Sequence, residues 1–245
     1  MLAAIGISAL VGYLLGSVNF AVIVAKKHGV DILKEGSGNP GATNVKRVLG
    51  KGPGNLVFML DALKGAVGTA LGYLAAYLFY LLPLFIKVVA EMPSGLAARF
   101  NASLDVLSHP EKYHADPDVV FATVVAGFVG TLLGHCFSCF LKFKGGKGVA
   151  STIGGLLVLL PVPILIGAAL WVLVFAASRY VSLASLALGL SLPLSCWLLP
   201  LFTKLTFGQP QFWFAAAIAA FNVWTHRANI GRLLAGTENR FGKKA

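Results

Sequence analysis

Three polar segments of this sequence contain the residue types that bind anions. The first, at residues 36–47, combines several glycines with Ser37, Thr43, Asn44 and Arg47. Small residues let successive backbone N–H groups turn toward one point and form a concave anion-binding site. A helix that begins near Thr43 would aim its N-terminus at the same anion. Glycine-rich loops also occur without a ligand, so these residues leave both an anion site and a plain flexible loop open.

The second polar segment, GHCFSCFLKFKGGKGVAST, occupies residues 134–152. Lys144 and Lys147 enclose two glycines, and an apolar run follows directly. The spacing is not that of a P-loop, but glycines for close approach and lysines for charge suit a phosphate. The alternatives are that the lysines only set membrane topology and that His135 caps the end of a helix.

The third polar segment, HRANIGRLLAGTENR, occupies residues 226–240. If it is helical, His226, Asn229 and Leu233 lie on one face, because they are three and four positions apart. Arg232 follows Asn229 by three positions. A basic amphipathic tail that contacts lipid headgroups is the alternative interpretation.

Two further groups of polar residues lie within or beside apolar runs. Asp61 and Lys64 are three positions apart, and ionisable residues inside a membrane are costly enough to predict either mutual pairing or a function. Ser182 and Ser185 follow Arg179 at the start of another apolar run. These serines either line a cavity shared with the other segments or cap a helix.

The sequence contains no recognisable nucleophilic triad. None of its five histidines is followed by Asp or Glu five positions later, so the His-x4-Asp pattern of common acyl-CoA acyltransferases is absent. Cys136 and Cys139 form a CxxC pair without the further ligands that zinc needs, and we expect all three cysteines to be packing residues. A loop with His109, His114, Asp116 and Asp118 is expected to be solvated, so neither a metal nor another cofactor is predicted.

The composition indicates a membrane protein. Hydrophobic residues make up 57% of the 245 positions and charged residues 12%, whereas soluble domains carry about 25% charged residues. A membrane-spanning helix needs about 20 apolar residues. Pro161 and Pro163 interrupt the longest uncharged run, which predicts two shorter helices in a hairpin. We therefore expect an all-α protein with about seven transmembrane helices, built from the uncharged runs 1–25, 65–86, 119–141, 148–178, 180–203 and 205–225.

The distribution of basic residues predicts the orientation of these helices. With the predicted crossings, 16 of the 20 Lys and Arg residues fall on one side of the membrane. Basic loops remain in the cytoplasm, so the N-terminus is expected outside and the C-terminus inside. The net charge of +11 then lies mainly at the cytoplasmic face, and no soluble domain is present that would carry this charge to a nucleic acid.

The three polar segments strongly resemble the conserved motifs of the PlsY family, the bacterial acyl-phosphate:glycerol-3-phosphate acyltransferases. The matching stretches are GSGNPGATNVKR, GHCFSCFLKFKGGKGVAST and HRANIGRLLAGTE, in the order and spacing of the family, and DALKG at Asp61–Gly65 also fits. The resemblance covers most of the chain and implies one integral-membrane acyltransferase domain over residues 1–245.

Two features depart from the family. Ser138 stands where a proline is expected, which predicts a looser turn, and an extracytoplasmic insertion at about 81–118 is longer than usual and contains a predicted amphipathic surface helix.

The resemblance implies transfer of a fatty acyl group from acyl phosphate to the 1-hydroxyl of sn-glycerol 3-phosphate, with lysophosphatidic acid and phosphate as products. The reaction would begin phospholipid synthesis at the cytoplasmic face of the bacterial inner membrane, in the lipid bilayer and without a protein partner. The implied acyl-phosphate site comprises Ser37, Gly38, Asn39, Gly41, Thr43 and Asn44. The implied glycerol 3-phosphate site comprises Arg47, Lys147, Ser182, His226 and Asn229. Supporting positions are Asp61, Lys64, His135, Lys144, Gly145, Gly146, Arg232 and Glu238.

The implied mechanism offers two candidates for the proton acceptor. Imidazole titrates near neutrality, so His226 is the obvious candidate base. A histidine that donates a hydrogen bond to a phosphate is a poor base, however, and the acyl phosphate carries oxygens that can accept the proton. We therefore expect substrate-assisted catalysis, with His226 as a binding residue and as the alternative base. A transporter or scramblase for anionic lipids and a lipid-binding scaffold are the competing functions.

Overall fold

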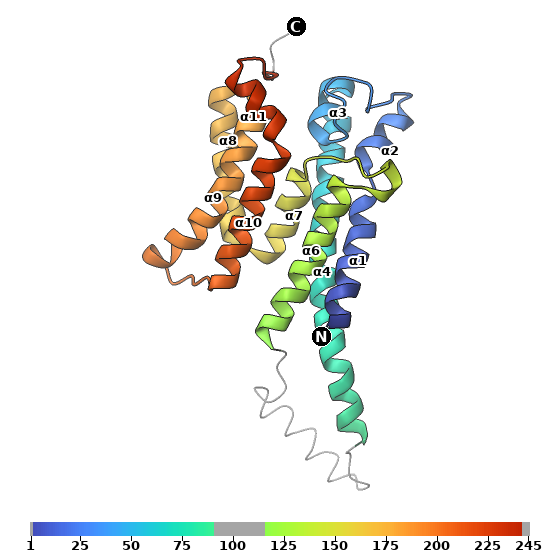
Figure 1. Ribbon diagram of the computed structural model, residues 1–245, viewed down its shortest axis with the longest axis vertical. Helices are drawn as coiled ribbons and strands as arrows, with labels where there is room; N and C mark the ends of the chain where they lie inside the picture. The colour runs from blue at the N-terminus through green and yellow to red at the C-terminus, as the bar shows by residue number, and fades with distance from the viewer. Residues whose placement is uncertain (1, 91–115, 242–245) are drawn as a thin grey trace.

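The computed structural model describes residues 2–90 and 116–241, and its regular secondary structure in these ranges is helical (Figure 1). The helices are α1 (Leu2–Ser17), α2 (Phe20–Lys27), α3 (Ala42–Leu49), α4 (Lys51–Ala90), α6 (Pro117–Cys136), the 3₁₀ turn η2 (Cys139–Leu141), α7 (Val149–Leu159), α8 (Pro161–Ser178), α9 (Val181–Phe202), α10 (Gln209–Thr225) and α11 (Arg227–Leu234).

In the part of the chain that the structure describes, five segments are long and apolar enough to cross a membrane, namely Leu2–Lys27, Lys51–Phe79, α6, α8 and α9. Many of their large apolar side chains face outward, including Leu173 and Trp197 at 67% and 60% exposure, as expected when lipid surrounds them. The all-α membrane class is therefore confirmed. The number of seven spans and the orientation stay predictions, because α7 and α10 are only 11 and 17 residues long.

The predicted hairpin between residues 148 and 178 is confirmed. The helix ends at Leu159, Leu160 leaves the helical conformation, and α8 begins with Pro161. Proline suits the first position of a helix because its missing N–H would have no helical partner there. At about 1.5 Å per residue, α7 is about 16 Å long, so it reaches only part of the way through a hydrocarbon core of about 30 Å.

Two helices differ in extent from the uncharged runs. The first apolar run forms one candidate span but is divided at Val18 and Asn19, where Asn19 caps α2 by accepting a hydrogen bond from the N–H of Val22 at 3.0 Å. Helix α4 continues to Ala90, so the predicted insertion at about 81–118 begins in helix, and its position outside the membrane stays a prediction. The predicted surface helix in the insertion falls mainly on residues 91–115, which lie outside the described residues.

Glycines bring α1, α4, α6 and α7 into backbone contact. A Cβ atom at Gly16 would lie 2.1 Å from the carbonyl oxygen of Thr131, and one at Gly130 would lie 2.2 Å from that of Ala9. The same holds between α4 and α7, where a Cβ at Gly154 would lie 1.8 Å from the carbonyl oxygen of Ala62. Small residues permit this close approach of membrane helices, so these four helices form one tightly packed unit.

The second unit consists of α8, α9 and α10, with α9 packed between the other two. Its contact with α6 combines aliphatic side chains, such as Leu132 and Ile218, with aromatic rings. The Phe214 ring lies edge-on to Phe128 and Phe121, with centroids 5.5 and 6.1 Å apart, and Phe137 lies 5.8 Å from Trp224. The two units therefore meet through long side chains, whereas the glycines of the first unit bring backbones together.

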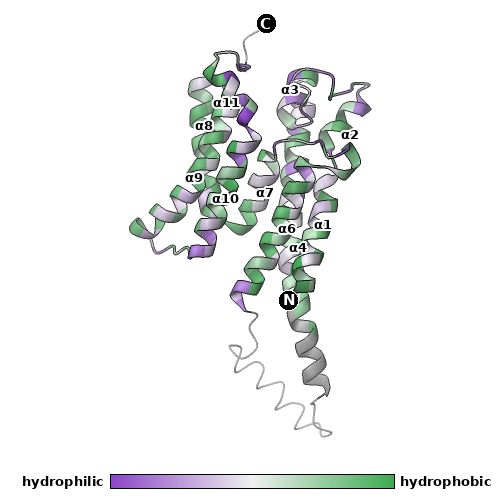
Figure 2. Cartoon of the chain, in the orientation of Figure 1, coloured by the Kyte–Doolittle hydropathy of each residue, from purple (hydrophilic) through white to green (hydrophobic). Residues whose placement is uncertain are grey.

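Hydrophilic residues concentrate at the end of the molecule that carries α2, α3 and α11, while the helix bodies are largely hydrophobic (Figure 2). The loop between α6 and α7 lies toward the same end (Figure 1). All three polar segments therefore lie toward one end of the helix bundle.

Candidate active site

A chain of hydrogen bonds joins four segments of the sequence at this end. Lys147, in the loop before α7, donates from Nζ to Oδ1 of Asn229 on α11. Asn229 Nδ2 and Ser182 Oγ, at the start of α9, donate to the same oxygen of Glu238 at 2.6 and 2.8 Å. Arg232 Nε donates to the other Glu238 oxygen at 2.7 Å. We refer to Lys147, Ser182, Asn229, Arg232 and Glu238 as the tail cluster.

His226 lies at the junction of α10 and α11, where it caps both helices. Its side chain is buried, and Nδ1 lies 2.9 Å from the carbonyl oxygen of Asn222. A carbonyl oxygen only accepts hydrogen bonds, so Nδ1 carries the proton and Nε2 of the neutral ring holds the free lone pair. The third polar segment is helical from Arg227 to Leu234 as predicted, with His226 and Asn229 both buried.

Burial and charge shift the pKa values of these groups. The pKa of Lys147 is lowered to about 8, mainly by burial. The Glu238 carboxylate acts to raise this pKa, and the charges of Arg232 and Arg47 act to lower it. Burial and, to a smaller extent, the Lys147 charge together lower the pKa of His226 to about 4. His226 is therefore neutral at pH 7, so in the free protein Nε2 accepts rather than donates.

Glu238 remains ionised despite its partial burial. Burial acts to raise its pKa, but hydrogen bonds from Asn229, Ser182 and Arg232 outweigh this and hold the pKa below its usual range. The carboxylate accepts the hydrogen bonds that an oxyanion of a bound phosphate would also accept from Ser182 and Asn229. The tail cluster is thus arranged to hold an anionic group.

The first polar segment forms a tight loop around the side chain of Asn44. Asn44 Oδ1 accepts from the Ser37 N–H at 2.8 Å, and its Nδ2 donates to the carbonyls of Ile32 and Glu35 at 3.2 and 2.9 Å. Asn44 is 1% exposed, so its amide is used to hold the loop. Its predicted contact with acyl phosphate stays a prediction.

The remaining residues of this loop surround the N-terminus of α3. The helix begins at Ala42, close to the predicted start, after Gly41 in an extended conformation. Gly38 adopts φ +67°, a conformation that glycine tolerates best. Ser37, Gly38, Asn39, Gly41 and Thr43 therefore lie together beside the first turn of α3, where unpaired backbone N–H groups favour an anion.

Arg47 belongs to α3 and contacts Asn44 Oδ1 at 3.4 Å. Its predicted grouping with Lys147 is supported only by the effect of its charge on the Lys147 pKa. Lys144 is exposed at the surface and forms a backbone bridge with Ser138. Within the described residues, the structure therefore joins Lys147 to Asn229 directly and Ser182 to Asn229 through Glu238, with His226 at the base of α11. Arg47 and Lys144 lie outside this hydrogen-bonded set.

The predicted pairing of Asp61 and Lys64 is confirmed. Asp61 Oδ1 and Lys64 Nζ are 3.0 Å apart, and both side chains are 2% exposed. His135 Nδ1 lies 3.5 Å from the same carboxylate oxygen, so His135 belongs to this group and is not a simple helix cap. Gly145 and Gly146 pack against the end of α6, where a Cβ at Gly145 would lie 2.2 Å from the His135 carbonyl oxygen.

Several other residues near the site have roles that the sequence did not indicate. Asn222 fixes the His226 ring through its carbonyl and ties α10 to α9, since its Nδ2 donates to the Ser185 carbonyl at 2.7 Å. The only signal was a polar residue in an apolar run, one helical turn before His226. Ser185 Oγ accepts a hydrogen bond from Trp171 Nε1 at 3.2 Å and so connects α9 to α8.

Cys136 and Cys196 are buried as predicted, but Cys139 is exposed, so its predicted packing role is wrong.

The turn at Ser138 is not loose. Ser138 is fully buried, and its Oγ donates to the carbonyl of Ser17 at 2.6 Å. Its own carbonyl accepts hydrogen bonds from the N–H groups of Leu141 and Phe143 at 3.1 and 2.8 Å. These three bonds fix the turn that precedes Lys147.

The chain matches known proteins over nearly its whole length. A sequence model of the family described as "Glycerol-3-phosphate acyltransferase" matches residues 6–236. The glycerol-3-phosphate acyltransferase of Shouchella clausii is 36% identical over 237 residues, covering 96% of this chain and 95% of that protein. The corresponding protein of Myxococcus xanthus is 37% identical over 234 residues, covering 95% of this chain and 97% of that protein.

Two solved structures share the fold. They are crystal structures of PlsY (YgiH), described as an integral membrane glycerol 3-phosphate acyltransferase. The glycerol 3-phosphate form gives a TM-score of 0.69 at 34% identity and covers 97% of this chain and 96% of its own. The lysophosphatidic acid form gives 0.67 at 34% identity and covers 97% and 95%. The chain therefore belongs to the glycerol-3-phosphate acyltransferase family of integral membrane proteins, the family of PlsY.

Proposed function

We propose that this protein transfers a fatty acyl group from acyl phosphate to the 1-hydroxyl of sn-glycerol 3-phosphate, at the cytoplasmic face of the bacterial inner membrane. The observation that carries the proposal is the tail cluster, which combines two cations with the buried donors Ser182 and Asn229 at the same end of the molecule as the glycine loop. Two anion-binding elements at one end suit two phosphorylated substrates. The lysophosphatidic acid form of the similar PlsY structure agrees with lysophosphatidic acid as the product.

The proposed reaction needs no protein nucleophile. The 1-hydroxyl oxygen attacks the acyl carbon, the bond from that carbon to the phosphate oxygen breaks, and the hydroxyl proton passes to the departing phosphate. An acyl phosphate is a mixed anhydride with a good leaving group, so holding two mutually repelling anions in contact is the main task. This accounts for a site built from amides, hydroxyls and cations.

We assign the two substrates to the two anion-binding elements. The acyl phosphate is bound by the loop Ser37–Thr43 and the N-terminus of α3. The phosphate of glycerol 3-phosphate is bound by Lys147, Ser182 and Asn229, and the charge of Arg47, which acts on Lys147, adds to this site. Arg232 and Glu238 hold Asn229, whose Nδ2 has a second N–H for the phosphate, and the Ser182 hydroxyl turns from Glu238 to the phosphate on binding.

We propose that His226 binds a hydroxyl of glycerol 3-phosphate, whereas the sequence had suggested that it donates a hydrogen bond to the phosphate. A neutral ring with Nδ1 bound to the Asn222 carbonyl presents an acceptor at Nε2, so we assign it a hydroxyl of glycerol 3-phosphate rather than the phosphate. General bases work best with a pKa near the operating pH, whereas the pKa of His226 is lowered to about 4. The acyl phosphate therefore takes the proton, and His226 binds and orients the acceptor.

The test is an assay of the purified protein in lipid nanodiscs with labelled glycerol 3-phosphate. We expect lysophosphatidic acid to form with acyl phosphate and not with acyl-CoA, without metal, cofactor or protein partner. Direct, rapid turnover of acyl-CoA would overturn the proposed donor. Binding of both phosphorylated compounds without product would instead favour a lipid-binding or transport function.

A further inference from the structure

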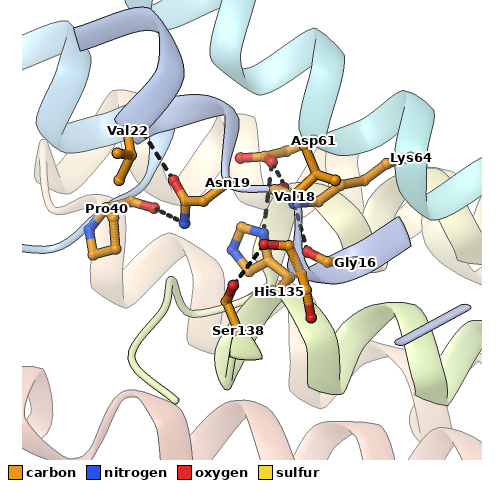
Figure 3. A network of polar contacts seen from close by, with 10 residues as sticks. Gly16, Val18, Asn19, Val22, Pro40, Asp61, Lys64, His135 and Ser138 are labelled. Carbon is orange, nitrogen blue, oxygen red and sulfur yellow. Dashed lines mark hydrogen bonds and ion pairs between the residues drawn. The ribbon is translucent and has the colours of Figure 1, made fainter. Parts of the chain in front are cut away.

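The break between α1 and α2 is held by side chains from two other helices (Figure 3). Lys64 Nζ, from α4, donates to the carbonyl oxygens of Gly16 and Val18 at 3.1 and 2.7 Å. Ser138 Oγ, from the turn after α6, donates to the carbonyl of Ser17 at 2.6 Å. The last carbonyls of a helix have no partner within that helix, so Lys64 and Ser138 together complete the end of α1.

The residue that follows this break contacts the loop assigned to acyl phosphate. Asn19 caps α2 through Oδ1, and its Nδ2 lies 3.4 Å from the carbonyl oxygen of Pro40. Pro40 is buried and stands between Asn39 and Gly41. The position of this loop is therefore tied to the position of Val18 and Asn19, and through Val18 to Lys64.

A second path leads from the same ion pair to the loop that contains Lys147. His135 Nδ1 lies 3.5 Å from Asp61 Oδ1, and the His135 carbonyl accepts the N–H of Gly146 at 3.1 Å. The ring itself packs on Gly146, where a Cβ would lie 2.2 Å from His135 Nε2. The orientation of this ring therefore determines where Gly146, and with it Lys147, can lie.

The Lys64 ammonium has three close partners in this arrangement. It donates hydrogen bonds to the Gly16 and Val18 carbonyls and forms an ion pair with Asp61 Oδ1 at 3.0 Å. A positive charge is also favoured beside the C-terminus of a helix such as α1. A neutral side chain of similar length would leave both carbonyls and the Asp61 carboxylate without this partner.

Resting on the proposed function, we infer that Asp61, Lys64 and His135 form a positioning unit that sets the acyl-phosphate loop and the Lys147 loop relative to each other. None of the three needs to touch a substrate. Asn19 is the connection to the first loop and Gly146 the connection to the second. The unit therefore acts on the binding of both substrates, whereas each connection acts on one.

Three variants separate these effects. Asn19→Ala removes the contact with Pro40, and we expect the KM for acyl phosphate to rise while that for glycerol 3-phosphate is unchanged. Gly146→Ala forces the Lys147 loop away from the His135 ring. We expect this variant to raise the KM for glycerol 3-phosphate and to leave the KM for acyl phosphate unchanged. The charge-neutral double variant Asp61→Asn/Lys64→Met avoids an unpaired buried charge and should raise both KM values by about tenfold, since a small misplacement of catalytic groups is sufficient for such losses.

A matched control is Thr69→Ala, which alters a buried polar residue of the same helix whose Oγ1 bonds only to the Gly65 carbonyl at 2.9 Å. Both of its KM values should equal those of the wild type. Hydrogen–deuterium exchange provides a readout that needs no turnover. The double variant should exchange faster in both residues 37–41 and residues 144–148. Asn19→Ala should exchange faster only in residues 37–41, and Gly146→Ala only in residues 144–148.

A double variant that lowers the melting temperature but leaves both KM values and both exchange patterns unchanged would mean that the ion pair serves only folding, and would overturn the inference. A change in one KM alone would also overturn it. Failure of the proposed function has a different signature, because the wild-type protein would then produce no lysophosphatidic acid from acyl phosphate while the exchange measurements would still report on the two loops.

Discussion

At the scale of single residues, His226 separates two mechanisms. His226→Ala removes the proposed acceptor for a substrate hydroxyl, so we expect the KM for glycerol 3-phosphate to rise by about tenfold, which corresponds to the loss of about one hydrogen bond. The saturated rate should change much less. Steady-state kinetics with varied glycerol 3-phosphate measures both quantities.

The competing mechanism gives a different result for the same variant. Loss of a general base would lower the saturated rate by about 10²–10⁴-fold, leave the KM unchanged and allow rescue by added imidazole. Thr225→Val is a suitable control, because the Thr225 hydroxyl lies 3.3 Å from His226 Nδ1 but leaves the bond from His226 to Asn222 in place. Its kinetics should stay close to those of the wild type.

The pKa of Lys147 predicts a pH dependence. Burial lowers that pKa to about 8 in the free protein, and a bound phosphate dianion must raise it because the dianion stabilises the protonated amine. Binding therefore favours the protonated amine, and the KM for glycerol 3-phosphate should be nearly constant between about pH 7 and 8, where the phosphate is a dianion, and rise above about pH 8, by up to about tenfold per pH unit.

The control for this dependence is Lys147→Arg. Arginine stays charged throughout the accessible range, so the KM of this variant should not rise between pH 7 and 9.5, whatever its absolute value. Initial rates across this range, corrected for spontaneous hydrolysis of acyl phosphate, measure the effect. A wild-type KM that is flat to pH 9.5 would contradict the lowered pKa.

Residue types could be predicted from the sequence better than residue partners. The buried polar positions Lys147, Ser182, His226 and Asn229 followed from the motifs. The use of Asn44 to tie its own loop did not, because an amide donates and accepts equally well to backbone or ligand. The tautomer of His226 was also inaccessible, because it depends on a carbonyl presented by the preceding turn of α10.

At the scale of helices and turns, Ser138 shows how one side chain fixes the end of another element. Ser138→Ala removes the hydrogen bond to Ser17 and leaves a buried carbonyl unpaired, so the free energy of unfolding should fall by about 1–3 kcal/mol. Ser138→Pro loses the same bond, but φ at this position is −62°, so the rigid ring should recover about 0.4–1 kcal/mol. Thermal melts in detergent compare the three proteins, and equal stability of all of them would contradict a role for the hydroxyl.

Apolar runs predicted the existence of the helices but not their ends. The division of the first run at Val18 and Asn19 is stabilised by Lys64 and Ser138, which are distant in sequence, so no local pattern marked it. The break before Pro161 was predictable because proline acts locally on the helix that precedes it. Helix ends that depend on tertiary contacts were missed, and ends that depend on proline were found.

At the scale of the whole molecule, the orientation in the membrane remains to be measured. The predicted split of 16 basic residues on one side of the membrane against 4 on the other predicts that position 51 lies in the cytoplasm and position 114 outside. In a background that lacks Cys139, an impermeant thiol reagent applied to intact cells should label His114→Cys and not Lys51→Cys. Permeabilised cells provide the control, since both positions should then react, and labelling of position 51 alone in intact cells would reverse the orientation.

The contrast between the two kinds of helix contact has a consequence for the catalytic cycle. Helices α1, α4, α6 and α7 meet backbone to backbone at glycines and cannot shift without steric overlap, whereas α6 and α10 meet through rings such as Phe128 and Phe214. Aromatic side chains can change rotamer and slide. We therefore expect the two units to shift relative to each other more easily than the helices within the first unit do. The loop assigned to acyl phosphate leads into α3, which packs on α4 of the first unit, whereas Ser182 begins α9 of the second unit and His226 and Asn229 follow α10. A relative shift of the two units would thus change the distance between the two assigned substrate sites, and it would act directly on the contact between Lys147 and Asn229.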